Sequence, residues 1–226
     1  MSKIEKNKPL PDHTKLRYGE CVAKVFLEHY FEERYGVLDI QDKPDLYSPK
    51  NDIGIEVTEA IDHKKKEAEK MWSTISYLDD VNEKENHIKQ MERLGFPFDS
   101  EEIQIWQTPM YEDGINSKPY DILFSSLKRK LEKLKSGQYR KCSKYEIFIK
   151  GEMMPCQEWE NELTLKIIRV ADETGIRPNR VYLLSQNVFQ MFDLEKRQSA
   201  WIDAEKEYHE LACKARELVE EAEENE

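Results

Sequence analysis

The chain has 226 residues, of which 38% are hydrophobic and 36% are charged, and its formal net charge is −11. This hydrophobic content supports one folded domain with extensions and excludes wholesale disorder, while the high charge content indicates long solvated helices. The negative net charge argues against a protein whose whole surface coats DNA. A local basic face that binds phosphate can still exist in an acidic chain, because binding depends on how the charge is distributed.

The N-terminal third predicts an arm, a helix and the start of a sheet. Residues 1–13 are polar and rich in lysine, which predicts a flexible N-terminal arm. Apolar residues recur at three- and four-residue steps over residues 14–35, which predicts an amphipathic helix that Gly36 ends. Three short extended segments follow, at residues 37–41, 45–47 and 53–58. The last alternates apolar and polar residues, as strands do.

The remaining chain alternates between helices and strands after an insertion. Residues 60–117 predict a helical insertion, with a charged helical pattern at 63–94 that breaks near Asp79-Asp80 and a short strand at 103–107. Beyond it we expect helices at residues 120–135 and 159–174, strands at 145–150 and 180–185, and a polar helix from about 196. This order predicts an α/β domain over residues 14–195, with a sheet covered on both faces, and a C-terminal helix with an acidic tail over 196–226.

Several common types of site find no support in the sequence. No GxGxxG or GxxxxGK[ST] pattern occurs, so dinucleotide-binding and P-loop functions lose their main signature. The four cysteines have no zinc-ligand spacing and predict reduced thiols in a cytoplasmic protein. The first residues lack the apolar region of a secretory signal, and no run reaches the ~18–20 apolar residues of a membrane span, so no membrane partner is expected.

Asp45 and Glu56 are the leading candidates for a chemical site. The turn-rich residues 48–52 join their two extended segments, so a hairpin would place both side chains on one face with Cβ atoms about 5 Å apart. Two carboxylates this close repel each other unless a cation lies between them, and Mg²⁺ uses one or two protein carboxylates. The alternative is that Gly54, Glu56 and Thr58 form a face that is merely exposed to water.

Pro44-Asp45, followed after ten residues by Glu56-Val57-Thr58, resembles the motif of the PD-(D/E)XK nuclease superfamily. In that superfamily an aspartate and a second acidic residue bind the metal, and a lysine two residues later orients or activates water. The resemblance covers roughly residues 14–185. It implies a restriction-endonuclease-like mixed sheet flanked by helices, with a core of one helix, a three-strand meander, a second helix and a further strand. It also implies Mg²⁺ or Mn²⁺ as the cofactor.

The chain departs from this motif at Thr58, which stands where the family has its lysine. Threonine supplies no positive charge, so either the lysine function has moved or the site is inactive and the fold serves binding. The chain resembles E-x-T members, which carry a lysine on the helix that faces the active site, here the helix at 120–135. On that helix Lys130 lies near the edge of the apolar stripe and is favoured over Lys128 and Lys133. The alternative for each lysine is a surface cation.

Two further sets of residues complete the predicted site. A glutamate from the first helix often points to the metal in the superfamily, and Glu20 is the candidate here, with an ordinary surface glutamate as the alternative. The segment 118–150 is basic and contains only three acidic residues. Its candidates for contacts with nucleic-acid phosphates are Lys128, Lys133, Arg140 and Lys141. A solvated helix face is the alternative for this segment.

The sequence therefore predicts a metal-dependent nuclease acting on nucleic acid, with DNA favoured over RNA and a homodimer possible by resemblance. Asp45, Glu56 and Glu20 would hold the metal, Lys130 would stabilise the nucleophile or the developing charge, and Thr58 would form a hydrogen bond in the same cluster. The missing motif lysine and the negative charge motivate the alternative, which is a catalytically inactive nuclease-fold protein that acts as a protein-interaction module.

Overall fold

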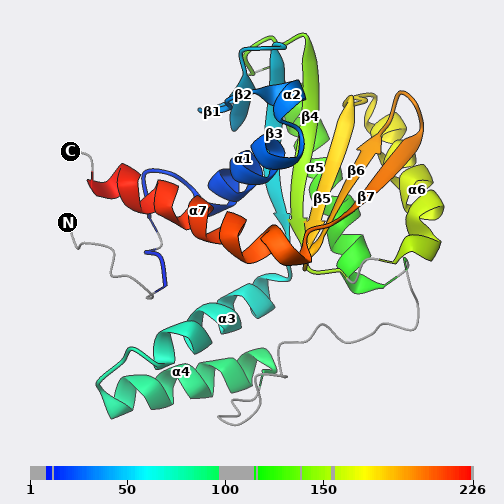
Figure 1. Cartoon of the computed structure of the whole chain (residues 1–226). Coiled ribbons are helices and arrows are strands. Elements are labelled where there is room, and N and C mark those ends of the chain that lie inside the picture. Colours follow the sequence, from blue (N-terminus) through cyan, green and yellow to red (C-terminus); the bar gives the residue numbers. More distant parts are fainter. Residues whose placement is uncertain are drawn as a thin grey trace.

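A computed structural model describes residues 9–11, 13–96, 115, 117–137, 139–153 and 156–224. Its centre is one seven-stranded sheet in which the strand order follows the chain (Figure 1). The strands are β1 (Asp39–Ile40), β2 (Leu46–Ser48), β3 (Ile53–Ala60), β4 (Lys144–Gly151), β5 (Arg180–Ser185), β6 (Val188–Asp193) and β7 (Gln198–Asp203). Strands β3, β4 and β5 are mutually parallel and the other neighbours are antiparallel, so the sheet is mixed.

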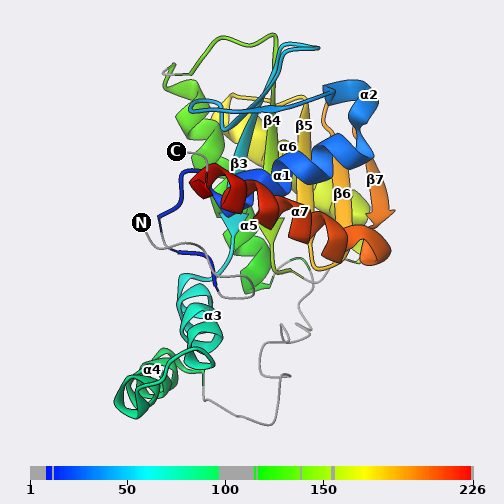
Figure 2. The ribbon, with the colours of Figure 1, turned by 60° about the vertical axis from the view of Figure 1, so that its left-hand side comes forward.

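Helices cover both faces of this sheet, as the alternation of helices and strands predicted. The helices are α1 (Tyr18–Tyr30), α2 (Glu32–Tyr35), α3 (His63–Ile75), α4 (Val81–Leu94), α5 (Lys118–Lys135), α6 (Glu160–Thr174) and α7 (Glu205–Glu224). Helices α1 and α7 lie side by side over one face (Figure 2). Helices α5 and α6 pack on the other face through a second apolar cluster. The α/β class with flanking helices and a C-terminal helix is therefore confirmed.

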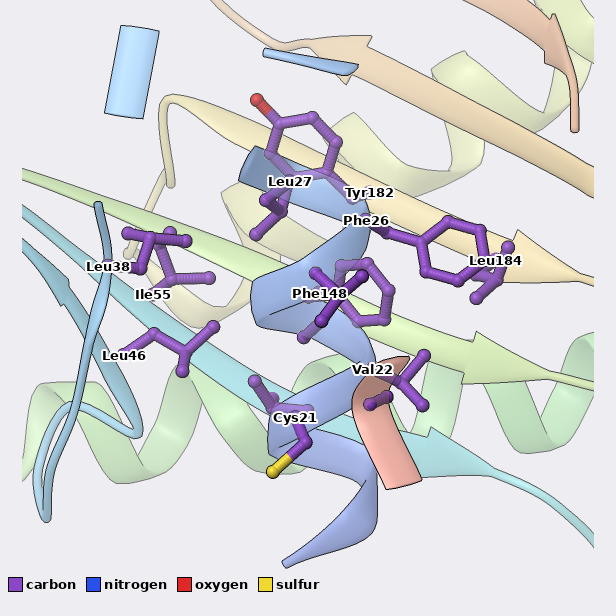
Figure 3. Packing of buried hydrophobic residues seen from close by; sticks show 14 of the residues in the cluster. Cys21, Val22, Phe26, Leu27, Leu38, Leu46, Ile55, Phe148, Tyr182 and Leu184 are labelled. Carbon is purple, nitrogen blue, oxygen red and sulfur yellow. The ribbon is translucent and has the colours of Figure 1, made fainter. Parts of the chain in front are cut away.

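The period of two in β3 divides its side chains between the two cores. Ile55 and Val57 join the cluster under α1, where they meet residues such as Val22 and Phe148 (Figure 3). Glu56 lies between them in sequence and so points to the opposite face, beneath α5. Burying the apolar face against α1 thus fixes the register that places one acidic side chain under α5.

Three sequence-based boundaries are wrong. The first helix begins at Tyr18 and is interrupted at Phe31, and the strand expected at 37–41 contains only β1. The helix expected from residue 196 begins instead at Glu205, because residues 198–203 form β7. The sheet therefore extends past the expected domain limit at residue 195. The strand expected at 103–107 lies outside the described residues.

Within the expected insertion, helices α3 and α4 form a hairpin that projects away from the sheet beyond the end of β3 (Figures 1 and 2). The expected break near Asp79-Asp80 is confirmed. The side chains of Asp62 and Asp80 accept backbone N–H groups at the starts of α3 and α4, as helix N-caps do. A small apolar cluster that includes Ala68, Ile75 and Met91 holds the two helices together.

The long strand β3 has an open edge. Strand β2 pairs only with Ile53, Gly54 and Ile55, whereas β4 pairs with all eight residues of β3. Residues 56–60 therefore have a strand neighbour on one side only among the described strands. An open edge leaves backbone N–H groups without ladder partners, so other groups must satisfy them.

Gly54 lets Pro44 approach the sheet at the start of this edge. A Cβ atom on Gly54 would lie 2.9 Å from Pro44 Cγ and 3.0 Å from Cys142 Sγ. The close approach of Pro44 holds the adjoining Asp45 beside β3. The Pro-Asp pair in the sequence thus depends on a glycine in the next strand.

Gly54→Ala is expected to destabilise the fold by about 1–3 kcal/mol, because the added methyl group overpacks this contact. Urea unfolding followed by circular dichroism measures the change. Gly19→Ala is the matched control: its Cβ would meet Glu59 at an ordinary 3.6 Å, and alanine favours the helix there. Equal stabilities for Gly54→Ala and the parent chain would contradict the prediction.

Candidate active site

Asp45, Glu56 and Lys130 meet where β2 leaves β3. The Lys130 ammonium lies 3.0 Å from Asp45 Oδ2 and 2.8 Å from Glu56 Oε2. The side chains are 14% exposed for Asp45 and Lys130 and 2% exposed for Glu56, so water screens this contact poorly. The three residues that the sequence predicts to act together therefore lie in contact, with Asp45 just before β2, Glu56 in β3 and Lys130 in α5.

The geometry of helix α5 places Lys130, and not its neighbours Lys128 and Lys133, in contact with the two carboxylates. Leu127 and Leu131 are buried against the sheet, so the residue between them at the margin of this stripe can reach the strand edge. Lys128 and Lys133 are exposed. Burial alone would lower the pKa of Lys130, but hydrogen bonds and attraction to Glu56 and Asp45 outweigh it and raise that pKa. The lysine therefore stays charged.

Asp45 also serves the open edge of β3. Its Oδ2 accepts a hydrogen bond of 2.7 Å from the backbone N–H of Val57, which lies just beyond the last pair of β2 with β3. The carboxylate thus supplies the hydrogen-bond acceptor that β2 no longer provides beyond its last pair with β3. Asp45 is consequently held in place by both the backbone and Lys130.

Glu56 carries an incompletely satisfied carboxylate. Its Oε2 accepts from Lys130 and from the hydroxyl of Tyr139 at 3.3 Å, whereas Oε1 is buried without a hydrogen-bond partner. Burial and the nearby Asp45 raise the pKa of Glu56. An unpaired buried carboxylate oxygen is costly, so Oε1 is an available acceptor for a cation or a water.

Tyr139 contacts the cluster through Glu56, although it is not among the candidate site residues predicted from the sequence. Burial and the charge of Glu56 raise its pKa to about 12, so the phenol stays protonated and donates. It follows α5 in a loop, and no periodic pattern in the sequence connects it to β3. Only the fold brings it to Glu56.

Glu20 reaches the site from α1. Its side chain is 13% exposed, and Arg17 Nη1 lies 3.5 Å from its Oε1. Burial raises its pKa to about 7, and repulsion by Asp45 and, less strongly, Glu56 adds to this effect. Glu20 is therefore electrostatically coupled to the cluster without being bonded to it.

Glu20→Gln is expected to stabilise the protein, in the presence of a chelator, by up to about 3 kcal/mol at about pH 8. The Glu20 pKa of about 7 in the folded state exceeds its ordinary value of 4.5, so the folded state loses stability as pH rises through this interval. Glutamine does not titrate, and the gain is expected to be much smaller at about pH 5. Urea unfolding at both pH values measures it. The exposed Glu33→Gln serves as the control, and an equal gain at both pH values would contradict the assignment.

The remaining predicted residues are less closely involved. Thr58 is buried two residues after Glu56, but its hydroxyl has no hydrogen bond to the cluster within the described part of the chain. Lys128, Lys133, Arg140 and Lys141 are all exposed. The Arg140 guanidinium stacks 3.8 Å from the ring centroid of Tyr47, which gives it a role in packing the β2–β3 region.

The arrangement offers two carboxylates rather than three to a metal. Across the residues that the structure describes, no group of three or more His, Cys, Asp or Glu side chains is placed to hold a metal ion. The Lys130 ammonium lies between the two carboxylates and balances part of their charge. Chemically, the cluster is a buried acidic pair with one fixed cation, beside a third carboxyl group whose pKa is near neutrality.

Comparison with known proteins adds no assignment. No family model, no curated protein and no solved structure matches this chain. In the described part of the chain, no helix is both long and apolar enough to cross a membrane. The functional argument therefore depends on the geometry of the Asp45–Glu56–Lys130 cluster.

Proposed function

We propose that the chain is a Mg²⁺-dependent nuclease that hydrolyses phosphodiester bonds, with DNA the favoured substrate. The observation that carries the proposal is the convergence of Asp45, Glu56 and Lys130 at a strand edge. These residue types match those of the PD-(D/E)XK motif, with the lysine moved to a helix. The order of α1, the β1–β2–β3 meander, α5 and β4 also agrees with the core of that superfamily.

The two carboxylates fit a magnesium ion. Glu56 Oε1 is buried and has no partner, and Mg²⁺ commonly takes one or two protein carboxylates with waters and substrate phosphate as its other ligands. Asp45 and Glu56 would hold the ion, which when bound polarises a phosphate and lowers the pKa of a bound water. Glu20 would act through water, since it is not bonded to either carboxylate. Mn²⁺ would suit the same oxygen ligands.

The chain's own residues then supply orientation, charge and proton transfer. Lys130 holds both carboxylates and offers a positive charge to the phosphate oxygens, and Tyr139 fixes the Glu56 carboxylate. Glu20 is suited to accept a proton from the attacking water, because its pKa of about 7 matches neutral conditions. Thr58 would add a hydrogen bond to water or phosphate at the same edge.

The direct test is cleavage of plasmid DNA and of a structured RNA with Mg²⁺, with Mn²⁺ and with a chelator. We expect DNA cleavage with either ion and none with the chelator. Cleavage that persists in the chelator would contradict metal dependence. The absence of any cleavage under all three conditions would contradict the nuclease proposal.

A catalytically inactive nuclease-fold module is the second candidate. Lys130 already neutralises part of the carboxylate charge without a metal, and Thr58 supplies no cation. In this case the projecting α3–α4 hairpin is a natural protein-contact element. Calorimetry with Mg²⁺ separates the candidates: binding that is lost in Asp45→Asn favours the nuclease, whereas no binding by the parent chain favours the module.

A further inference from the structure

Two hollows adjoin each other along the open edge of β3. One, of about 760 Å³, lies between the start of α1 and β3 and includes Glu20 and Thr58 in its lining. The other, of about 620 Å³, lies between the start of α3 and α5. Both are lined by Glu59, His63, Lys66 and Arg129. The shared lining makes them one continuous groove, which begins beside Glu20 and Thr58 and passes between α3 and α5.

The combined lining of the groove holds five lysine or arginine side chains and four carboxylates, namely Arg17, Lys64, Lys66, Lys118 and Arg129 with Glu20, Glu59, Asp62 and Asp121. Arg17 pairs with Glu20. Lys66 pairs with Glu59 and Lys118 pairs with Asp62, so these two cations are balanced locally. Arg129 is exposed on α5 and faces both hollows.

Lys64 is exposed on the first turn of α3 and lines the second hollow. Within the described residues neither Arg129 nor Lys64 has an ion pair. Two cations without an ion pair therefore line the groove, Lys64 from α3 and Arg129 from α5, together with one carboxylate, Asp121, from α5.

We propose that this groove binds the phosphodiester backbone of a nucleic-acid strand that runs past Glu20 toward the Asp45–Glu56–Lys130 cluster. Phosphate oxygens suit lysine and arginine on two facing walls, and the groove opens next to Glu20. This inference rests on the proposed nuclease function, and it gives the helical insertion a role. Helix α3 forms one wall of the groove.

The groove binds the backbone without selecting a sequence. The aromatic ring of Tyr18 lines it, but this ring already faces the Lys150 ammonium at 5.4 Å and its hydroxyl donates to the Ala212 carbonyl. Tyr18 is the only Phe, Tyr or Trp that lines the groove within the described residues, and the imidazoles of His13 and His63 are the other aromatic rings in its lining. Phosphate contacts position a strand and carry no sequence information. Binding should accordingly depend on salt and very little on base composition.

The test measures binding in a chelator, so that cleavage plays no part. Fluorescence anisotropy of labelled single-stranded and duplex DNA and of labelled single-stranded RNA follows binding by the parent chain and by the double variant Lys64→Gln/Arg129→Gln. We expect the variant to bind about tenfold to thirtyfold more weakly than the parent chain. The slope of log affinity against log salt concentration should also decrease, by the release of roughly one to two fewer counterions. The matched control is Arg169→Gln/Lys206→Gln, which removes one arginine and one lysine that are exposed on α6 and α7.

The outcomes separate this inference from the proposed function. Unchanged binding by the groove variant, or equal loss in the control, overturns the groove assignment even if the protein cleaves DNA. Groove-dependent binding by a protein that never cleaves supports the groove and contradicts the nuclease. Failure of the parent chain to bind any of the probes overturns the groove assignment. The charge-conserving variant Lys64→Arg/Arg129→Lys should retain binding, which excludes a folding defect as the cause.

Discussion

Glu56→Gln is expected to reduce Mg²⁺-dependent cleavage by more than about a hundredfold while the protein remains folded. Mutating a residue that only hydrogen-bonds to a metal ligand typically lowers metal affinity or activity about tenfold to a hundredfold. Removing the charge of a direct ligand should therefore lower activity by more than this. Glutamine keeps the shape of glutamate and can still accept from Lys130 and Tyr139, but it carries no charge to attract the ion. The measurement is the initial rate of plasmid nicking together with the affinity for Mg²⁺ by calorimetry.

Glu146→Gln is the matched control for this experiment. Glu146 is a buried glutamate on the adjacent strand β4, and it pairs with Arg34 and accepts from the Tyr35 hydroxyl on the α1 side of the sheet. Losing its charge should lower stability, because a buried ion pair loses one partner, yet the folded fraction should cleave normally. Parental activity in Glu56→Gln, or equal loss in both variants, would contradict the assigned role of Glu56.

The sequence predicted the residues of the candidate site better than it predicted the boundaries of the sheet and the helices. Asp45 and Glu56 could be placed because a turn between two alternating segments fixes which side chains share a face. The resemblance to E-x-T members implied a lysine on this helix, and Lys130 could be chosen among the helix lysines because its position relative to the buried stripe of α5 is set by the helical period. These inferences depend on local periodicity, which a single sequence displays. Glu20 was placed from family resemblance, and burial together with repulsion from Asp45 couples it to the cluster.

The elements that were missed depend on long-range or unusual local features. Strand β6 follows β5 through a two-residue turn at Gln186-Asn187, and Gln186 has a φ of 50° without being glycine. Arg197 adopts a φ of 55° before β7, again where glycine would have signalled a turn. Charged residues on both sides made β7 resemble the helix that follows it. Tyr139 was missed because a loop residue acquires its partner only from the tertiary fold.

Lys130→Met is expected to destabilise the protein by about 3 kcal/mol in a chelator and to recover much of this loss when Mg²⁺ is added. The change leaves Asp45 and Glu56 without the cation between them, and removing one member of a buried ion pair typically costs about 3–5 kcal/mol. Burial and Asp45 already raise the pKa of Glu56, so the remaining acidic pair would be strained and would favour any cation that replaces the ammonium.

Urea unfolding with and without Mg²⁺ measures the rescue, since an ion that binds only the folded state stabilises it by an amount that rises with the logarithm of its concentration relative to its Kd. Lys133→Met, three residues further along α5 and exposed, should unfold like the parent chain under both conditions. A destabilised Lys130→Met that gains no more from Mg²⁺ than the parent would mean that the carboxylates cannot accept the ion. The cluster would then be a structural ion pair at the open edge of β3, and the inactive module would become the better account of the chain.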